Sequence, residues 1–71
     1  MLLKLIIMMT IFSGVVDQIN QDKATIEYEI DNAVYYTTVS IKDSDCVPKE
    51  GERVRFAINS KIYECRGANE W

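Results

Sequence analysis

Polar and apolar residues alternate without a break from Lys23 to Asp31. One face carries four apolar side chains and the other four polar ones: Ala24, Ile26, Tyr28 and Ile30, then Thr25, Glu27, Glu29 and Asp31. A period of two is typical of a strand with one buried face. Because Asp31 and Asn32 tolerate positive φ, they predict a two-residue turn. The resulting hairpin pairs Ile30 with Ala33, Tyr28 with Tyr35, Ile26 with Thr37 and Ala24 with Val39.

A second alternation runs from Arg53 to Ile58, with Val54, Phe56 and Ile58 predicted to face the core. A turn at Asn59-Ser60 places three pairs across the hairpin: Phe56 with Tyr63, Val54 with Cys65, and Arg55 with Glu64. The segment 43–51 between the two hairpins contains Pro48 and Gly51, which favour a loop. It leaves no room for a long helix.

The chain before the first hairpin predicts one long strand, from about Leu5 to Ile19, with Gly14 as its bend or bulge. The order is then long strand, hairpin, loop and hairpin, with residues 67–71 as a tail. Closure of a short sheet removes its two exposed edges. We therefore expect one all-β domain over residues 1–71, a small five-stranded antiparallel barrel with a long bent first strand.

Three segments carry a resemblance to known folds: Ser13-Gly14-Val15-Val16-Asp17-Gln18-Ile19, Lys23-Ala24-Thr25-Ile26-Glu27 and Val47-Pro48-Lys49-Glu50-Gly51-Glu52-Arg53-Val54. A glycine-containing strand, an alternating strand and a P-x-E-G-E/D-x-V turn resemble the pattern of small SH3-like and OB-like barrels. The missing helix after the third strand favours the SH3-like version. The resemblance brings no functional motif, so it implies a fold and no site residues.

The N-terminal segment, residues 1–12, is apolar apart from Lys4 and Thr10. It is shorter than the roughly 20 apolar residues that span a bilayer. It is interpreted as a paired strand, a plug in the open end of the barrel, a signal peptide over residues 1–13, or an oligomer contact. Since seven of the eight residues 2–9 are apolar and do not alternate, one face of such a strand needs a cover. We expect Leu3, Leu5, Ile7 and Met9 to contact a protein partner or a second copy.

The composition argues against an enzyme. The chain has no histidine, which removes the usual general base, and it has no glycine-rich phosphate loop. The carboxylates of Glu27, Glu29 and Asp31, and those of Asp43 and Asp45, are interpreted as solvated surface groups rather than cation ligands. We expect no catalytic residue, no metal site and no cofactor.

The two cysteines, Cys46 and Cys65, leave two states open. An oxidising compartment would allow a bridge between the 43–51 loop and the last strand, whereas the cytoplasm would keep both thiols free. Ile11 and Ser13 make a poor signal-peptide cleavage site. We therefore expect free thiols, a cytoplasmic location and no membrane partner, with an exported protein as the alternative.

The charge distribution adds a second binding hypothesis. The net charge is −3, but residues 49–66 are locally basic. Tyr36, Arg53, Arg55 and Lys61 are the candidates for binding single-stranded nucleic acid, which the net charge disfavours. The leading hypothesis is a non-enzymatic protein-binding module or small accessory or inhibitor subunit, of the size that phages and mobile elements encode. A secreted or envelope-associated protein is the third hypothesis.

Overall fold

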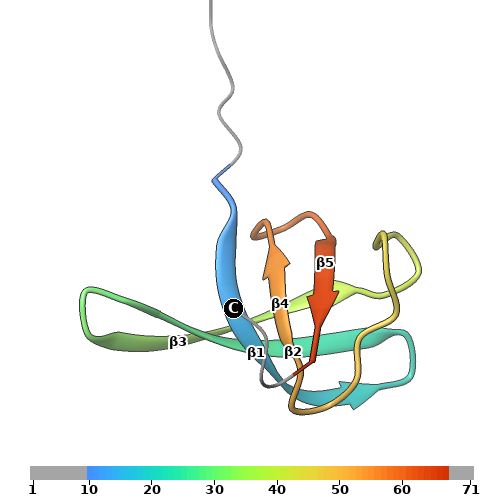
Figure 1. Ribbon diagram of the computed structural model, residues 1–71, viewed down its shortest axis with the longest axis horizontal. Coiled ribbons are helices and arrows are strands. Elements are labelled where there is room, and N and C mark those ends of the chain that lie inside the picture. The colour runs from blue at the N-terminus through green and yellow to red at the C-terminus, as the bar shows by residue number, and fades with distance from the viewer. Residues whose placement is uncertain (1–9, 68–71) are drawn as a thin grey trace, which may run out of the picture.

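The computed structural model describes residues 10–67 of the 71-residue chain (Figure 1). Its five strands are β1 (Phe12–Asn20), β2 (Lys23–Ile30), β3 (Ala33–Ser40), β4 (Arg53–Phe56) and β5 (Ile62–Arg66). They form one antiparallel sheet in the order β3-β2-β1-β4-β5, without a helix in the described range. The predicted all-β architecture of five antiparallel strands is confirmed. Because the edge strands β3 and β5 do not pair, the sheet is not a closed barrel.

The centre of the sheet is β1, which pairs with a neighbour on each side. Phe12 to Val15 pair with β4, and Gly14 to Asn20 pair with β2. The β1–β2 register shifts between Val16 and Gln18, so the irregularity lies at Asp17 rather than at Gly14 as expected. One strand does serve two parts of the sheet, as the sequence predicts. The expected beginning of this strand at Leu5 lies outside the described residues.

The first hairpin has the predicted register at every pair from Lys23–Ser40 to Ile30–Ala33. Its turn residues have the positive φ angles that a type I′ turn requires, 52° at Asp31 and 70° at Asn32. The alternation of polar and apolar residues is sufficient to predict this register, because a shift by one residue would place Glu27 and Glu29 on the core face.

The second hairpin has the predicted pairs Val54–Cys65 and Arg55–Glu64, but Phe56 lies opposite Ile62 instead of Tyr63. β4 ends at Phe56, and Ala57 N donates to Lys61 O across a longer turn. Tyr63 on β5 is therefore left without a directly opposite residue on β4, and the register shifts after Arg55. As a consequence Ile62 is fully buried, whereas Ile58 and Tyr63, both predicted to face the core, are exposed and half-buried respectively.

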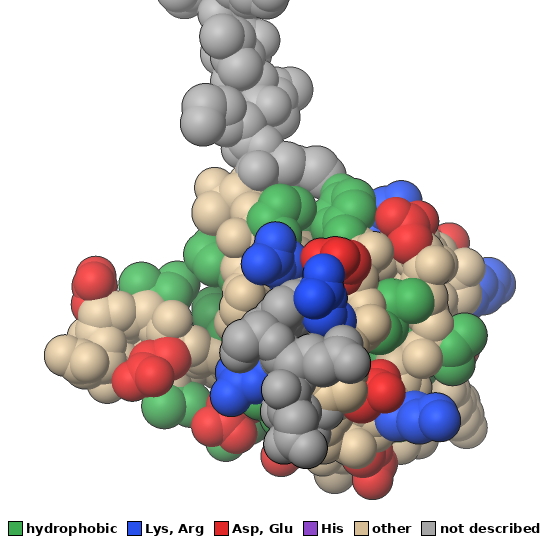
Figure 2. Space-filling model, in the orientation of Figure 1, with side chains coloured by type: hydrophobic (Ala, Val, Ile, Leu, Met, Phe, Trp, Pro, Cys, Tyr) green, Lys and Arg blue, Asp and Glu red, His purple; other side chains and the backbone are tan. Residues whose placement is uncertain are grey.

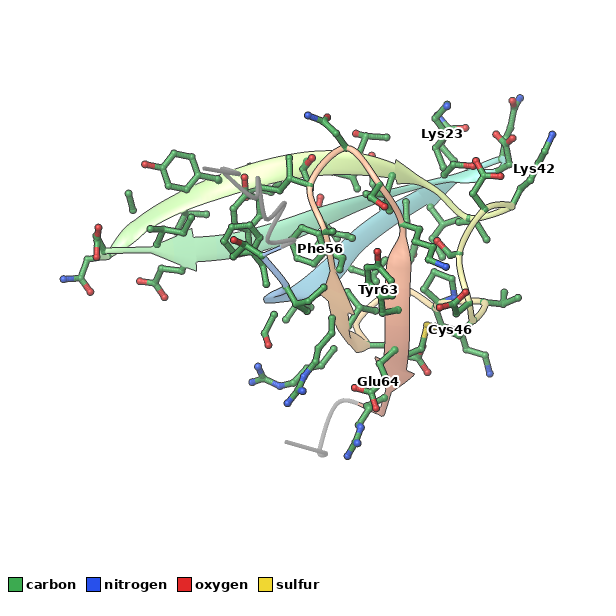
Figure 3. All side chains as sticks on the ribbon, turned by 90° about the horizontal axis from the view of Figure 1, so that it is seen from above. Lys23, Lys42, Cys46, Phe56, Tyr63 and Glu64 are labelled. Atoms are coloured by element: carbon green, nitrogen blue, oxygen red, sulfur yellow. A yellow bond between two sulfur atoms is a disulfide. The ribbon has the colours of Figure 1, made fainter. Side chains whose placement is uncertain are left out.

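The core lies inside the curled sheet, where Phe56 occupies a central position (Figure 3). Its buried side chains come from all five strands: Val16, Ala24, Ile26, Val39, Val54, Phe56 and Ile62. Phe12 and Tyr28 pack against this cluster. Tyr35, in contrast, is 47% exposed, so its predicted place in the core is wrong.

The loop between β3 and β4 bridges the gap between the two edge strands. Ser44 Oγ donates a hydrogen bond to Ser40 O at the end of β3 and accepts one from Ile62 N at the start of β5. Asp45 N donates to Ile62 O at 2.9 Å. Side chains and loop backbone therefore connect β3 to β5 at this end, where no strand pairing does.

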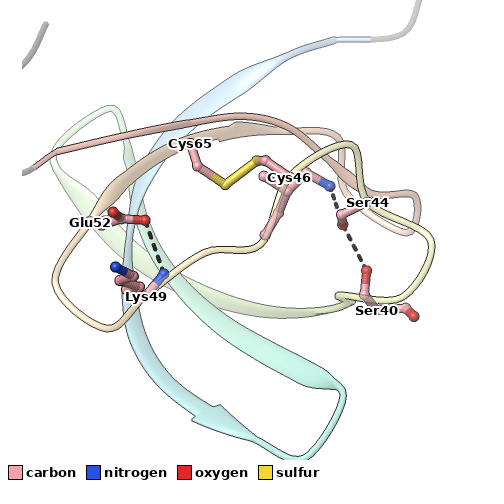
Figure 4. The surroundings of a disulfide bond; sticks show 7 residues. Ser40, Ser44, Cys46, Lys49, Glu52 and Cys65 are labelled. Carbon is pink, nitrogen blue, oxygen red and sulfur yellow. Dashed lines mark hydrogen bonds between the residues drawn. A yellow bond between two sulfur atoms is a disulfide. The ribbon is translucent and has the colours of Figure 1, made fainter.

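A disulfide joins the same loop to β5. Cys46 and Cys65 are bonded, with 6.1 Å between their Cα atoms (Figure 4). The expectation of free thiols is therefore wrong. The sequence could not decide this point, because the two cysteines are 19 residues apart and their distance depends on the path of an irregular loop.

Gly14 allows β1 to approach its neighbours closely. A Cβ atom at this position would lie 2.6 Å from the backbone oxygen of Glu27, 2.6 Å from Ile26 Cγ2 and 3.1 Å from the ring of Phe56. The first of these is main chain, which cannot move without disturbing the β1–β2 ladder. Glycine is thus required at this position for space.

We expect Gly14→Ala to lower the free energy of unfolding by about 2 to 3 kcal/mol, as overpacking of a tight core does. Urea denaturation measures this change. Gly67→Ala is the matched control, because nothing lies within 4 Å of a Cβ there. Equal denaturation midpoints for the two variants would contradict the close approach of β1 and β2.

Candidate functional site

Exposed apolar side chains gather on the hairpin formed by β2 and β3. Of the seven large apolar side chains exposed in the described range, four belong to this hairpin: Ile30, Val34, Tyr35 and Tyr36. We call residues 27–38 the β2–β3 arm. It extends away from β4 and β5 in Figure 1, and apolar and acidic side chains lie along it in Figure 2.

The inner face of the arm is continuous with the core through a row of aromatic rings. The Tyr28 ring lies 5.3 Å from that of Phe56 and 5.6 Å from that of Phe12, measured between centroids. On its other side it stacks on Tyr35 at 5.7 Å. Aromatic pairs at these spacings attract each other beyond their buried area. The row therefore holds the exposed Tyr35 in place against the folded core.

The outer face of the arm combines apolar and acidic groups. Tyr36, which is 59% exposed, lies directly opposite Glu27, and Val34 lies opposite Glu29. A shallow hollow of about 360 Å³ opens beside them, lined by Ser13, Gly14, Val15, Glu27, Tyr28, Glu29, Val34 and Arg53. On this surface Val34 and Tyr36 lie at the β3 edge, the carboxylates of Glu27 and Glu29 lie next to them on β2, and Arg53 lines the hollow from β4.

The free edge of β3 is the third element of the arm. Among residues 10–67, β3 pairs only with β2, and its eight residues include no charge and no proline. Alternate residues of an antiparallel strand direct their N–H and C=O groups to opposite sides. The pair Ile30–Ala33, which flanks the turn, is hydrogen-bonded, and at the other end of the hairpin Ile41 N donates to Asp22 O. By alternation, the backbone N–H and C=O groups of Val34, Tyr36 and Thr38 therefore point away from β2.

The candidate nucleic-acid residues do not form one cluster. Tyr36 is on β3 and Arg53 on β4, and Glu27 and Val15 stand between them in the same row across the sheet. Arg55 Nε lies 3.8 Å from Glu64 Oε1. The structure therefore brings Arg53 and Arg55 onto one face of β4 but does not bring the tyrosine to them.

Lys61, the fourth of these residues, lies in the turn before β5. Its Nζ atom donates to Asp45 Oδ1 at 2.8 Å and lies 5.0 Å from the centre of the Tyr63 ring. The hydrogen bond to Asp45 raises the pKa of Lys61 above its ordinary value, against a smaller opposing effect of desolvation. This stabilisation is present below the ordinary pKa of lysine and is lost as pH rises through the raised value. Lys61 thus links the loop between β3 and β4, residues 41–52, to the turn that precedes β5.

The candidate contacts Leu3, Leu5, Ile7 and Met9 lie outside the described residues, so their role stays a prediction. The β2–β3 arm was missed because alternation placed Tyr35 in the core. A signal was present: no charged residue occurs from Ala33 to Ser40. Solvated strands ordinarily carry charges, and their absence over eight positions indicates a surface that does not repel a partner.

In residues 10–67 no group of three or more potential ligand side chains is arranged to hold a metal ion, and no helix is of a length and apolarity that would cross a membrane. Comparison with models of protein families, with curated proteins and with solved structures finds no match to this chain.

Proposed function

We propose that the protein is a non-enzymatic protein-binding module that acts as a small accessory or inhibitor subunit. The observation that carries this proposal is the exposure of Ile30, Val34, Tyr35 and Tyr36 on one projecting hairpin. Contiguous apolar exposure rimmed by charged groups marks interaction surfaces, and tyrosine is enriched at the centres of interfaces. The row of rings behind Tyr35 supports the proposal, because a fixed side chain loses little entropy on binding.

A capture experiment with cross-linking tests this function. We expect Val34→Ser combined with Tyr36→Ser to abolish capture of the partner that the wild-type protein retains from its native extract. Val47→Ser is the matched control, since Val47 is 78% exposed but lies in the 41–52 loop. Folding of each variant is checked by its thermal melt. Capture that depends equally on Val47 and on the arm would contradict the proposal.

The N-terminal segment provides a second proposed contact. Its seven apolar side chains in residues 2–9 support association with a partner or with a second copy. A variant lacking residues 1–8 is then expected to fold and to sediment as a monomer, while the full chain sediments as a larger species. Unfolding of the shortened variant, with a monomeric full chain, would assign the segment to the core instead.

Two finer assignments accompany the proposal. The resemblance of residues 13–58 to SH3-like barrels is supported by the curled sheet and by the loop that bridges β3 and β5. The disulfide supports the exported alternative over a cytoplasmic location, because disulfides persist in oxidising compartments. N-terminal sequencing of protein recovered outside the cytoplasm tests the second assignment.

A further inference from the structure

We propose that the partner binds by strand addition, with an extended segment rich in lysine or arginine pairing along the free edge of β3. This inference rests on the proposed protein-binding function and specifies its geometry and its chemistry. It is carried by the backbone of β3, by the side chains of the β2–β3 arm, and by the sign of the charges on that arm.

The two edges of the sheet differ in how they are protected. Natural sheets protect edge strands with charges, prolines, bulges or short length, because an open edge pairs with other chains. β5 is short, carries Glu64 and Arg66, and is tied to the 41–52 loop by a disulfide. β3 has eight residues without charge, proline or register shift. Only its last residue, Ser40, is engaged by the loop.

The open groups on β3 have the spacing of a strand-binding site. Val34, Tyr36 and Thr38 each direct one N–H and one C=O outward, at every second residue. A short antiparallel segment would bond to all three in the manner of a peptide added to a sheet edge. The partner residues directly opposite would share the outer face with Tyr36, and those between them would share the inner face with Tyr35.

The charges of the arm select the partner. Glu27, Glu29 and Asp31 are its only ionisable groups apart from the tyrosines. Arg53, which lines the hollow together with Glu27 and Glu29, lies on β4, three strands away from the β3 edge. An added strand would lie about 10 Å from β2, two strand spacings, which the long side chains of lysine and arginine bridge. A second copy paired at β3 would bring two acidic arms together. Charge complementarity therefore favours a basic segment of another protein.

The side-chain pattern of the partner follows from the two faces. Its outer-face residues meet Tyr36 and the carboxylates of Glu27 and Glu29, which suits lysine or arginine. Its inner-face residues continue the surface of Tyr35 and Ile30, which suits apolar side chains. A basic residue alternating with an apolar one is thus the expected sequence.

The test uses fluorescein-labelled peptides and the wild-type chain, with binding followed by fluorescence anisotropy. Lys-Val-Lys-Val-Lys-Val-Lys is expected to bind and Glu-Val-Glu-Val-Glu-Val-Glu is not. Two N-methylated forms of the first peptide are matched in charge and composition. Methylation on the lysines removes the N–H groups that face β3 and is expected to abolish binding, whereas methylation on the valines leaves it intact.

Variants of the protein locate the site. Thr38→Pro removes an outward N–H and is expected to weaken peptide binding about tenfold, whereas Thr38→Val keeps the N–H and the affinity. The β2–β3 ladder does not use this N–H, so Thr38→Pro is expected to fold. If Thr38→Pro does not fold, the two methylated peptides alone test strand addition. Glu27→Gln with Glu29→Gln is expected to weaken binding at least about threefold, with a smaller salt dependence.

Equal binding of the two methylated peptides would overturn strand addition. Equal binding of the acidic peptide would overturn the choice of a basic partner, and a β3-dependent dimer would assign the edge to a second copy. If no peptide binds but capture still depends on Val34 and Tyr36, this inference fails and the proposed function stands. If no peptide binds and capture is also independent of the arm, both strand addition and the proposed function of the arm fail.

Discussion

Replacing Phe56 with alanine is expected to lower the free energy of unfolding by about 3 to 5 kcal/mol. The Phe56 side chain is fully buried and lies within 6 Å, centroid to centroid, of the rings of Phe12 and Tyr28. A chain of this length has a total stability of the order of 5 kcal/mol. Much of the variant would therefore be unfolded at physiological temperature, as urea denaturation followed by circular dichroism would show.

Tyr35→Ala is the control for Phe56→Ala, and the loss of unfolding free energy is compared between the two variants. Tyr35 belongs to the same row of rings but is 47% exposed. Its truncation is expected to cost only about 1 kcal/mol, because much of the side chain is already in water. Equal losses at the two positions would show that the β2–β3 arm packs into the core, which would contradict its description as a free surface.

Reduction of the Cys46–Cys65 disulfide is expected to cost about 3 kcal/mol, from the loop-closure entropy of a ring of about twenty residues. For a domain of this size the melting temperature would fall by the order of 10 to 20 °C. Calorimetry with and without a reductant measures the shift. The bridge has this effect because it limits the conformations of the unfolded chain between Cys46 and Cys65.

The double variant Cys46→Ser with Cys65→Ser supplies the control for the disulfide. We expect its melting temperature to match that of the reduced wild-type protein and to be insensitive to reductant. A wild-type melting temperature that reductant leaves unchanged, together with two thiols that react on unfolding, would mean that the cysteines are not bridged.

The parts of the fold that the sequence predicted are those fixed by local patterns. The pairing of Lys23–Ile30 with Ala33–Ser40 follows from strict alternation and a turn at Asp31-Asn32, and it is found residue for residue. The loop after β3 is predicted by Pro48 and Gly51, two residues that favour loops over strands. In each case neighbouring residues contain the whole physical reason.

The parts that could not be predicted depend on contacts between distant residues. The register of β4 and β5 changes after Arg55 because the turn is longer than its two polar residues suggest, and Ile62 rather than Tyr63 reaches the core. The exposure of Tyr35 depends on where the curl of the sheet ends, which alternation along one strand does not contain. Alternation shows which residues share a face but not whether that face is covered.

The candidate site was missed for the same reason. The sequence predicts apolar exposure in residues 2–9 and basic groups in residues 49–66, and its alternation places Tyr28 and Tyr35 in the core. The structure adds the sheet order, which makes β3 an edge strand. Only with that order does the uncharged run from Ala33 to Ser40 become a surface available to a partner.

Amide hydrogen exchange along β3, resolved by NMR, tests the open edge most directly. In the protein alone we expect slow exchange at Ala33, Tyr35 and Thr37, whose N–H groups bond to β2, and fast exchange at Val34, Tyr36 and Thr38. This alternation would confirm an edge that is paired on one side and free on the other. Slow exchange at all six amides would contradict it, because the outward groups would then already have partners.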